Sequence, residues 1–202
     1  MPLWLADRPL VLASKSAVRH AVLRDAGLTA EVVPADIDER AVEGRAGTQD
    51  PSAIATLLAR EKARVIATRL PGRLVLGADQ TLALGARRFS KPGDVGAARE
   101  QLKALRGKTH TLHSAIALVR EGDVLFDHCE IARLTMRDFS DDFLTAYLAA
   151  AGTAVTASVG AYQLERLGIQ LFERIEGDHF VILGLPLFAL LRYLRDSGFL
   201  AA

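Results

Sequence analysis

Short apolar runs alternate with amphipathic segments through most of the chain. The runs are typical of buried strands, and the segments have apolar residues at helical spacing after a Ser or Asp cap. Two strand-like segments flank Glu121-Gly122-Asp123, which predicts a hairpin. This alternation indicates an α/β fold with a mixed sheet. We expect strands at 10–13, 30–34, 74–84, 109–119 and 124–136, helices at 17–26, 51–70, 95–106, 142–151, 169–174 and 186–196, and a polar loop over 36–50.

One charged residue interrupts the apolar pattern. Asp79 lies inside the segment Leu74–Leu84, which otherwise reads as a buried strand. A buried carboxylate is costly unless a cation or hydrogen-bond donors meet it. The sequence therefore predicts a charged or polar partner for Asp79 elsewhere in the chain.

Composition limits the classes of function. The 202 residues suit one α/β domain or two small lobes on a shared sheet, and half of them are hydrophobic. We expect a single domain spanning 1–202. The net charge of +1 gives no electrostatic case for nucleic acid or a membrane surface. No apolar run reaches the ~18 residues of a membrane span, and no basic stretch precedes a long apolar one. With Cys129 as the sole cysteine, we expect a cytoplasmic protein without disulfides or a cysteine-rich metal site.

Two clusters near the amino terminus could bind a charged ligand. Ser14, Lys15 and Arg19 gather where the first strand runs into a helix, and this arrangement suits a phosphate. Alternatively, the serine hydroxyls only cap the helix. Glu39 ends the acidic stretch that starts at Asp36, and its oxygens suit Mg²⁺, although a solvated acidic loop has the same composition.

Two lysines could supply positive charge to a site. Lys62 falls within or at the edge of the apolar stripe of the helix 51–70. It could extend along that stripe into water, or direct its ammonium into a cleft toward a carboxylate or phosphate. Pro92 holds Lys91 in an extended conformation, which fixes its direction, but a plain surface turn explains the same residues.

The ordered set of motifs resembles the Maf family of nucleoside triphosphate pyrophosphatases. The matching stretches span nearly the whole chain. The resemblance implies a central mixed sheet flanked by helices, as in inosine triphosphate pyrophosphatases, with two lobes and a cleft between them. It also implies dependence on Mg²⁺ or Mn²⁺ and cleavage between the α- and β-phosphates. The stretches are LASKSAVRHAVLRDAG, DIDE, LAREKA, LVLGADQ, SKP, LRGKTHTLHSAIAL, GAYQLERLGIQLFERIEG and GLPLFALLRYL.

The resemblance also implies roles for individual residues. Asp79 would accept a proton from the attacking water, and Glu39 would bind the metal with it. Lys62 and Lys91 would stabilise phosphate charge. The residues implied to bind the triphosphate are Ser14 and Arg19.

Two further residues bear on the base. Gln80 and Glu165 look like the 7-methyl-GTP pyrophosphatase branch of the family. A carboxylate accepts both N–H groups on the pairing edge of guanine and favours the positive charge that N7 methylation adds. Val18 and His20 depart from that branch, so other modified nucleotides, or a non-catalytic nucleotide-binding regulator of cell division, remain alternatives.

The carboxyl-terminal amphipathic helix leaves the oligomeric state open. Its apolar face could pack inside one chain or form the face of a homodimer. The expected partner is a nucleoside triphosphate, with no nucleic acid and no membrane.

Overall fold

The computed structural model describes residues 3–202. The chain divides into two compact units. The first unit consists of the residues up to Gln80, Ser114–Glu130 and His179–Ala202. The second unit consists of Thr81–His113 and Ile131–Asp178. Three long strands contribute residues to both: β3 (Val75–Leu84), β5 (Thr109–Arg120) and β6 (Asp123–Met136).

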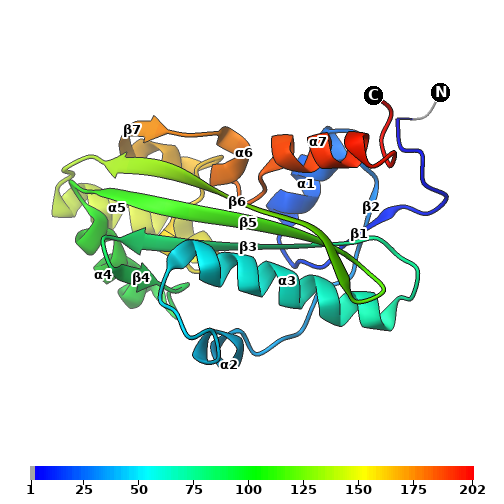
Figure 1. Cartoon of the computed structure of the whole chain (residues 1–202). Coiled ribbons are helices and arrows are strands. Elements are labelled where there is room, and N and C mark those ends of the chain that lie inside the picture. The colour runs from blue at the N-terminus through cyan, green and yellow to red at the C-terminus, as the bar shows by residue number, and fades with distance from the viewer. Residues whose placement is uncertain (1–2) are drawn as a thin grey trace. The chain divides into compact units, whose positions relative to one another are not determined.

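The first unit is a mixed sheet with helices on both faces. Its strands follow the order β2-β1-β3-β5-β6, and β1 pairs in parallel with β2 and with β3. Figure 1 shows α3 along one face of this sheet and α1 and α7 on the other. The elements wholly within this unit are β1 (Leu10–Leu12), α1 (Ala17–Asp25), β2 (Ala30–Val32), α2 (Glu39–Gly44), α3 (Pro51–Arg69), α6 (His179–Ile182) and α7 (Leu187–Asp196).

Strand alternation determines which face each side chain reaches. Val11 of β1 and Val75 of β3 pack with Ile66 of α3. Leu76, the next residue of β3, packs with Leu194 of α7 on the opposite face. Because successive side chains of a strand point to opposite faces, the sheet has a separate apolar core on each side.

The turn between β5 and β6 has the geometry of a tight hairpin. Glu121 and Gly122 both have positive φ angles, of 54° and 91°. A two-residue turn with this backbone matches the right-handed twist of the strands it joins. The hairpin that the sequence predicted is therefore confirmed.

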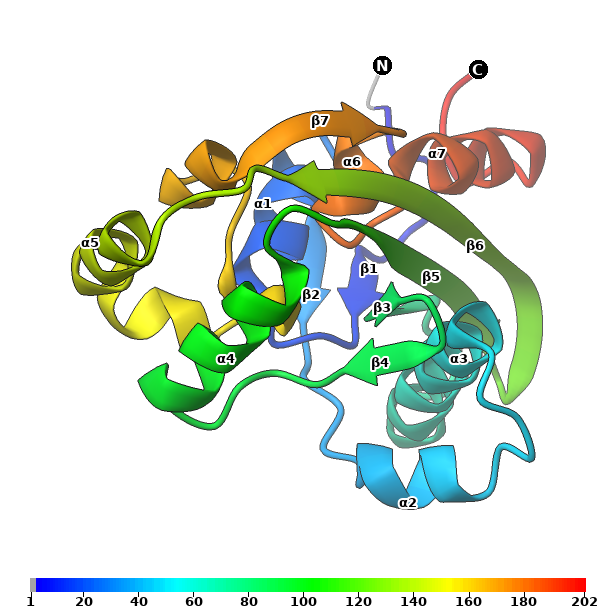
Figure 2. The same ribbon diagram turned by 90° about the vertical axis from the view of Figure 1, so that its left-hand side faces the viewer.

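The second unit carries the shorter elements. Its strands follow the order β4-β3-β5-β6-β7, with β4 antiparallel to β3 and β7 antiparallel to β6. Figure 2 shows α4 following β4, with α5 beside it. The elements wholly within this unit are β4 (Arg87–Phe89), α4 (Val95–Leu105), α5 (Asp141–Ala151), the 3₁₀ segments Gly152–Thr156, Val159–Ala161 and Leu167–Leu171, and β7 (Phe172–Glu176).

Two sequence-based assignments were wrong. The expected loop over 36–50 contains the short helix α2, which Asp38 caps by accepting from the amide of Ala41. The expected helix at 169–174 is instead the end of a 3₁₀ segment followed by β7. The sequence of β7 is mostly polar and lacks the apolar pattern of a strand. Pairing with β6 therefore determines its conformation. The sequence also missed β4 and α6.

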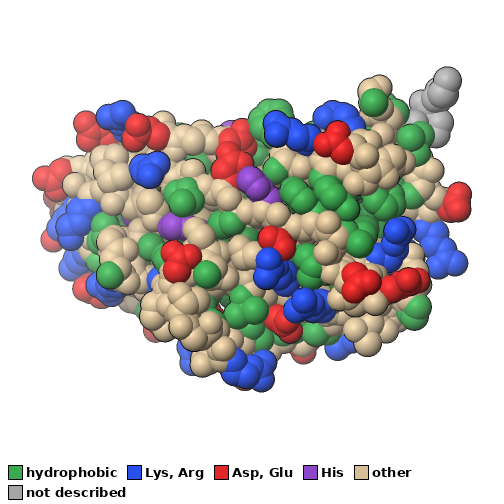
Figure 3. Space-filling view, in the orientation of Figure 1, with side chains coloured by type: hydrophobic (Ala, Val, Ile, Leu, Met, Phe, Trp, Pro, Cys, Tyr) green, Lys and Arg blue, Asp and Glu red, His purple; other side chains and the backbone are tan. Residues whose placement is uncertain are grey.

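The predicted fold class is confirmed, because a central mixed sheet is flanked by helices. A single domain over 1–202 and a cleft between lobes stay predictions. Among the described residues 3–202, no helix is long and apolar enough to cross a bilayer. On the face that Figure 3 shows, acidic and basic side chains are interspersed.

Candidate functional site

The buried carboxylate of Asp79 has a cationic partner. Nζ of Lys62 lies 2.6 Å from Oδ1 of Asp79 and 2.6 Å from Oε1 of Glu39. The side chains of Lys62 and Asp79 are 12% and 10% exposed, whereas that of Glu39 is 52% exposed. The ammonium therefore joins a buried carboxylate to one that faces solvent. Of the two orientations that the sequence allowed, Lys62 directs its ammonium to carboxylates.

Local packing explains how α3 reaches this strand. Gly77 and Asp79 are two residues apart on β3 and so share the face that α3 covers. A Cβ at Gly77 would lie 2.0 Å from the carbonyl oxygen of Ala59 and 3.0 Å from the Cβ of Ala63, both on α3. Glycine therefore lets α3 pack closely on β3 and carry Lys62 to Asp79.

Burial and charge act in opposite directions on this cluster. Burial raises the pKa of the Asp79 carboxyl, while the charges of Lys62 and Arg19 oppose that rise. Burial also lowers the pKa of Arg19, which the negative charges of Asp79 and Glu39 counteract. Burial outweighs these charges, so the pKa of Asp79 stays above its usual value and the carboxyl binds a proton more readily than an exposed aspartate does.

Arg19 is fixed at the end of the parallel strands. Its Nη1 donates to the carbonyl of Ala78 at 2.8 Å and to Oγ of Ser14 at 3.2 Å. Its Nε donates to the carbonyl of Gly184 at 2.8 Å. Ser16 caps α1 by accepting from the amide of Arg19. The structure thus brings Ser14 and Arg19 together at the amino terminus of α1, a location that favours anions.

Gln80 points away from Asp79. The two are consecutive on β3, so their side chains take opposite faces. Nε2 of Gln80 donates to Oγ of Ser114 at 2.8 Å and to the carbonyls of Val181 and Ile182 at 3.1 and 3.0 Å. The amide is therefore tied to β5 and α6, not to α3.

Two sequence-predicted residues belong to the second unit. Lys91 follows β4 and is exposed, and Glu165 is exposed in the turn before the 3₁₀ segment Leu167–Leu171. Their positions relative to Asp79 stay predictions.

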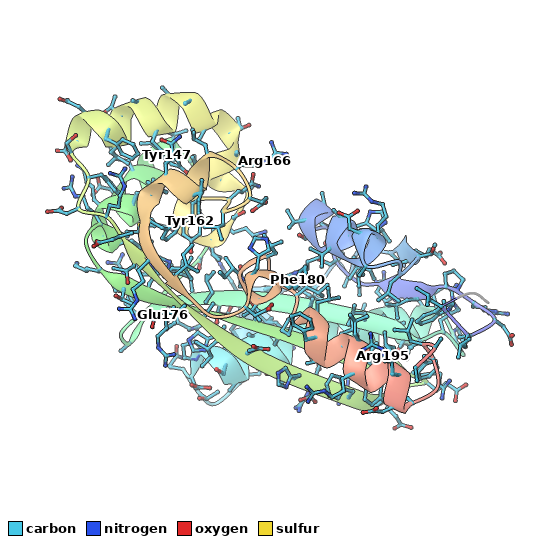
Figure 4. All side chains as sticks on the ribbon, turned by 90° about the horizontal axis from the view of Figure 1, so that it is seen from above. Tyr147, Tyr162, Arg166, Glu176, Phe180 and Arg195 are labelled. Carbon is cyan, nitrogen blue, oxygen red and sulfur yellow. The ribbon has the colours of Figure 1, made fainter. Side chains whose placement is uncertain are left out.

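A cavity of about 200 Å³ also lies in the second unit, beside α5. Figure 4 labels three residues of its lining, Tyr147, Tyr162 and Arg166. The hydroxyl of Tyr162 bonds to Nε2 of His110 at 2.8 Å, and that of Tyr147 donates to the carbonyl of Ala161 at 3.2 Å. Because both hydroxyls are used within the unit, the aromatic rings are what these residues offer to the cavity.

The sequence reasoning missed three residues that shape the site. Gly77 allows α3 to pack closely on β3, and Gly184 leaves room for the guanidinium of Arg19. Ser114 accepts a hydrogen bond from the side chain of Gln80. A Cβ at Gly184 would lie 3.1 Å from two nitrogens of Arg19. Ser114 carried a usable signal, because it is a polar residue inside an apolar strand, as Asp79 is.

The carboxylates of Glu39 and Asp79 suit a divalent cation only if a bound ligand supplies further oxygen atoms. Mg²⁺ in phosphate sites is held by one or two carboxylates plus substrate phosphate oxygens, and Glu39 and Asp79 are two such groups. In the part of the chain that the structure describes, no cluster of three or more His, Cys, Asp or Glu side chains could hold a metal. The donor set therefore fits a metal that arrives with a phosphate ligand.

These features define a class of site. A buried carboxylate lies beside a lysine, an arginine and a serine, near the end of parallel strands and a helix amino terminus. Such a site can activate water next to a phosphate. The chain belongs to the Maf family, because the family model described as Maf-like protein matches residues 9–197.

Two relatives in sequence agree with this assignment. A protein of Nitrobacter hamburgensis named nucleoside triphosphate pyrophosphatase is 56% identical over 202 residues, which cover all of both chains. A Rhizobium etli protein named 7-methyl-GTP pyrophosphatase is 50% identical over 192 residues, covering 94% of this chain and 96% of that protein. A solved nucleoside-triphosphatase / dITP/XTP pyrophosphatase of Mycobacterium abscessus is similar at a TM-score of 0.45 and 16% identity, covering 95% of each chain. A likeness this distant says nothing of activity.

Proposed function

We propose that the protein is a nucleoside triphosphate pyrophosphatase. It would hydrolyse the bond between the α- and β-phosphates and release a nucleoside monophosphate and pyrophosphate. The observation that carries this proposal is the contact of Lys62 with both Asp79 and Glu39. The name of the Nitrobacter hamburgensis relative supports the same activity.

Each residue of the cluster has a separate task in this reaction. Asp79 accepts the proton of the water that attacks phosphorus, and the charge of Lys62 opposes the rise in pKa that burial causes in this carboxyl. Arg19, held by three oxygen acceptors, keeps its positive charge at a fixed point next to Ser14. Positive charge that is already in place stabilises the negative charge that spreads over the phosphoryl oxygens. Lys91 would add to this charge.

A divalent cation completes the proposal. Glu39 and Asp79 would hold Mg²⁺ or Mn²⁺ together with oxygens of the substrate. When bound, the ion would neutralise phosphate charge and polarise the phosphoryl group. Lys62 already lies between the two carboxylates, so it would share them with the ion.

We further propose a preference for a guanine-type base, with 7-methyl-GTP as the expected substrate. Glu165 offers a carboxylate that can accept two N–H groups and that favours a positively charged base. The 7-methyl-GTP name of the Rhizobium etli relative supports this preference. We also expect the protein to act in the cytoplasm, where nucleoside triphosphates are available.

The test compares pyrophosphate release from 7-methyl-GTP, GTP, UTP and dTTP in the presence of Mg²⁺ or Mn²⁺. We expect kcat/KM to be highest for 7-methyl-GTP. Faster turnover of UTP or dTTP would contradict the base preference and leave the pyrophosphatase proposal standing. Triphosphate binding without pyrophosphate release at any metal concentration would contradict the enzymatic proposal and favour the regulator.

A further inference from the structure

The side-chain amide of Gln80 is held in one orientation. Its nitrogen faces three oxygen acceptors, which are Oγ of Ser114 and the carbonyls of Val181 and Ile182. Turning the amide over would place its oxygen against the two carbonyl oxygens, which donate no hydrogen. The orientation therefore follows from the chemistry of the surrounding groups.

The Ser114 hydroxyl acts toward Gln80 only as a hydrogen-bond acceptor. Its hydroxyl donates to the carbonyl of Val181 at 2.6 Å, so its oxygen is left to accept from Gln80. Ser114 is completely buried, and its bond to Gln80 is the shortest of the three that the amide makes. The hydroxyl thus links the amide of β3 to the last turn of α6.

We propose that Ser114 is a positioning residue that, together with the carbonyls of Val181 and Ile182, holds Gln80 as a pure hydrogen-bond acceptor toward the substrate. This inference rests on the proposed function and extends it to base selection. Because the protein uses the amide hydrogens of Gln80, the oxygen Oε1 is the polar atom left for a ligand. Gln80 is half-buried, and its Oε1 is not among the fully buried, unpartnered side-chain atoms of the described residues, so solvent can reach this oxygen.

A fixed acceptor selects among nucleotide bases. An amide that is free to turn can donate to a carbonyl and accept from an N–H, which suits the N–H and carbonyls of uracil. An oxygen that only accepts requires an N–H donor, and guanine presents two adjacent ones. A base that places a carbonyl against Oε1 is rejected, because two acceptors face each other. Ser114 would therefore act on specificity through Gln80.

The first test is a double-mutant cycle with Ser114→Ala, Gln80→Leu and the double variant. Loss of a single neutral hydrogen bond corresponds to about a three- to tenfold change in equilibrium. We expect Ser114→Ala to raise KM for 7-methyl-GTP by this factor, with kcat within about twofold of the wild-type value. The preference for 7-methyl-GTP over UTP should fall by the same factor. In the Gln80→Leu background, Ser114→Ala should change neither quantity.

The matched control is Thr68→Ala, which removes a hydroxyl bonded to the carbonyl of Arg64 on α3. It should leave KM and the base preference unchanged. Equal effects of Ser114→Ala in the wild-type and Gln80→Leu backgrounds would overturn the inference, because Ser114 would then act independently of Gln80.

A second test does not depend on turnover. In protein labelled with ¹⁵N at the glutamine side chains, the resonances missing from Gln80→Leu identify the Gln80 amide. Its hydrogens should exchange slowly with solvent in the wild type and much faster in Ser114→Ala. The amide of Gln101, which donates to the carbonyl of Ser90, serves as an internal reference. Unchanged exchange in Ser114→Ala would refute the inference, whereas a wild type that releases no pyrophosphate from any triphosphate would refute the proposed function.

Discussion

Nζ of Lys62 lies 2.6 Å from Oδ1 of Asp79, and both side chains are nearly withdrawn from solvent. The cost of burying the Asp79 carboxylate is offset by this contact, and the same ammonium also contacts a second carboxylate, Glu39, at 2.6 Å. The pair allows the Asp79 carboxyl to be buried, and its lysine also contacts the solvent-facing side chain of Glu39. Structure and proposed chemistry therefore depend on the same three residues.

Lys62→Met tests how much the contact between Lys62 and Asp79 contributes to the stability of the fold. It leaves the Asp79 carboxylate buried without its closest cation, so we expect a loss of about 3 kcal/mol in the free energy of unfolding. Urea denaturation at neutral pH measures the effect. Lys103→Met, which removes an exposed lysine that lies 3.6 Å from Glu100, is the control and should change stability little. Equal stability of the two variants would mean that the contact contributes nothing.

Gly77→Ala tests the close approach of α3 to β3. The added methyl group would lie 2.0 Å from the carbonyl oxygen of Ala59, so the helix must shift. We expect a loss of roughly 2 kcal/mol or more in stability, together with lower activity because Lys62 moves with α3. Gly44→Ala is the matched control, since no atom lies within 4 Å of its added methyl. A Gly77→Ala variant as stable and active as Gly44→Ala would disprove this packing account.

The stability of the second unit should depend on His110. Burial lowers the pKa of His110 to about 4, from 6.5 in an exposed histidine, and the ring contacts Tyr162 and Phe172. The unfolded chain therefore binds a proton that the folded chain does not between these two pH values. Titration of His110 therefore leaves stability unchanged above pH 6.5 and lowers it progressively as the pH falls from 6.5 to 4, by about 3 kcal/mol in all.

This pH dependence is measured as the difference between the wild type and His110→Gln, because carboxylates titrate over the same range in both proteins. The free energy of unfolding of the wild type should fall more steeply between pH 6.5 and 4. Parallel profiles for the two proteins would show that His110 does not titrate as a buried, neutral group.

Removal of divalent metal should abolish pyrophosphate release, and Mg²⁺ or Mn²⁺ should restore it. Glu39→Gln should then raise the metal concentration needed for half-maximal activity by at least about tenfold, since even indirect partners of a metal contribute that much. Glu61→Gln on α3, whose carboxylate pairs with Arg64 at 3.2 Å, is the control. Full activity in a chelator, or the same metal requirement in both variants, would exclude a metal site at Glu39.

The sequence predicted those parts of the site that depend on the pattern within a single segment. Asp79 in an apolar strand required a charged or polar partner, and Lys62, within or at the edge of an apolar helical stripe, was one candidate. Strand alternation separates Asp79 from Gln80, and the structure follows it. These features depend on local periodicity, which a single sequence contains.

Other features depend on partners far away in the chain. β7 has polar, charged residues and becomes a strand because β6 offers an edge to pair with. The acceptors of Gln80 come from positions 114, 181 and 182, and no local pattern connects them. The need for glycine at position 77 appears only when the backbone of α3 is placed against β3.

The most direct test of the central claim is pyrophosphate release by Asp79→Asn, measured beside Asp127→Asn with 7-methyl-GTP and UTP. Asp127 is matched because it also pairs with a cation on α3, Arg60, at 2.7 Å. We expect Asp79→Asn to lower kcat by about 100-fold or more on every nucleotide that the wild type hydrolyses, because a general base is lost. Asp127→Asn should retain activity. An Asp79→Asn variant that stays within a few-fold of the wild type would contradict the account.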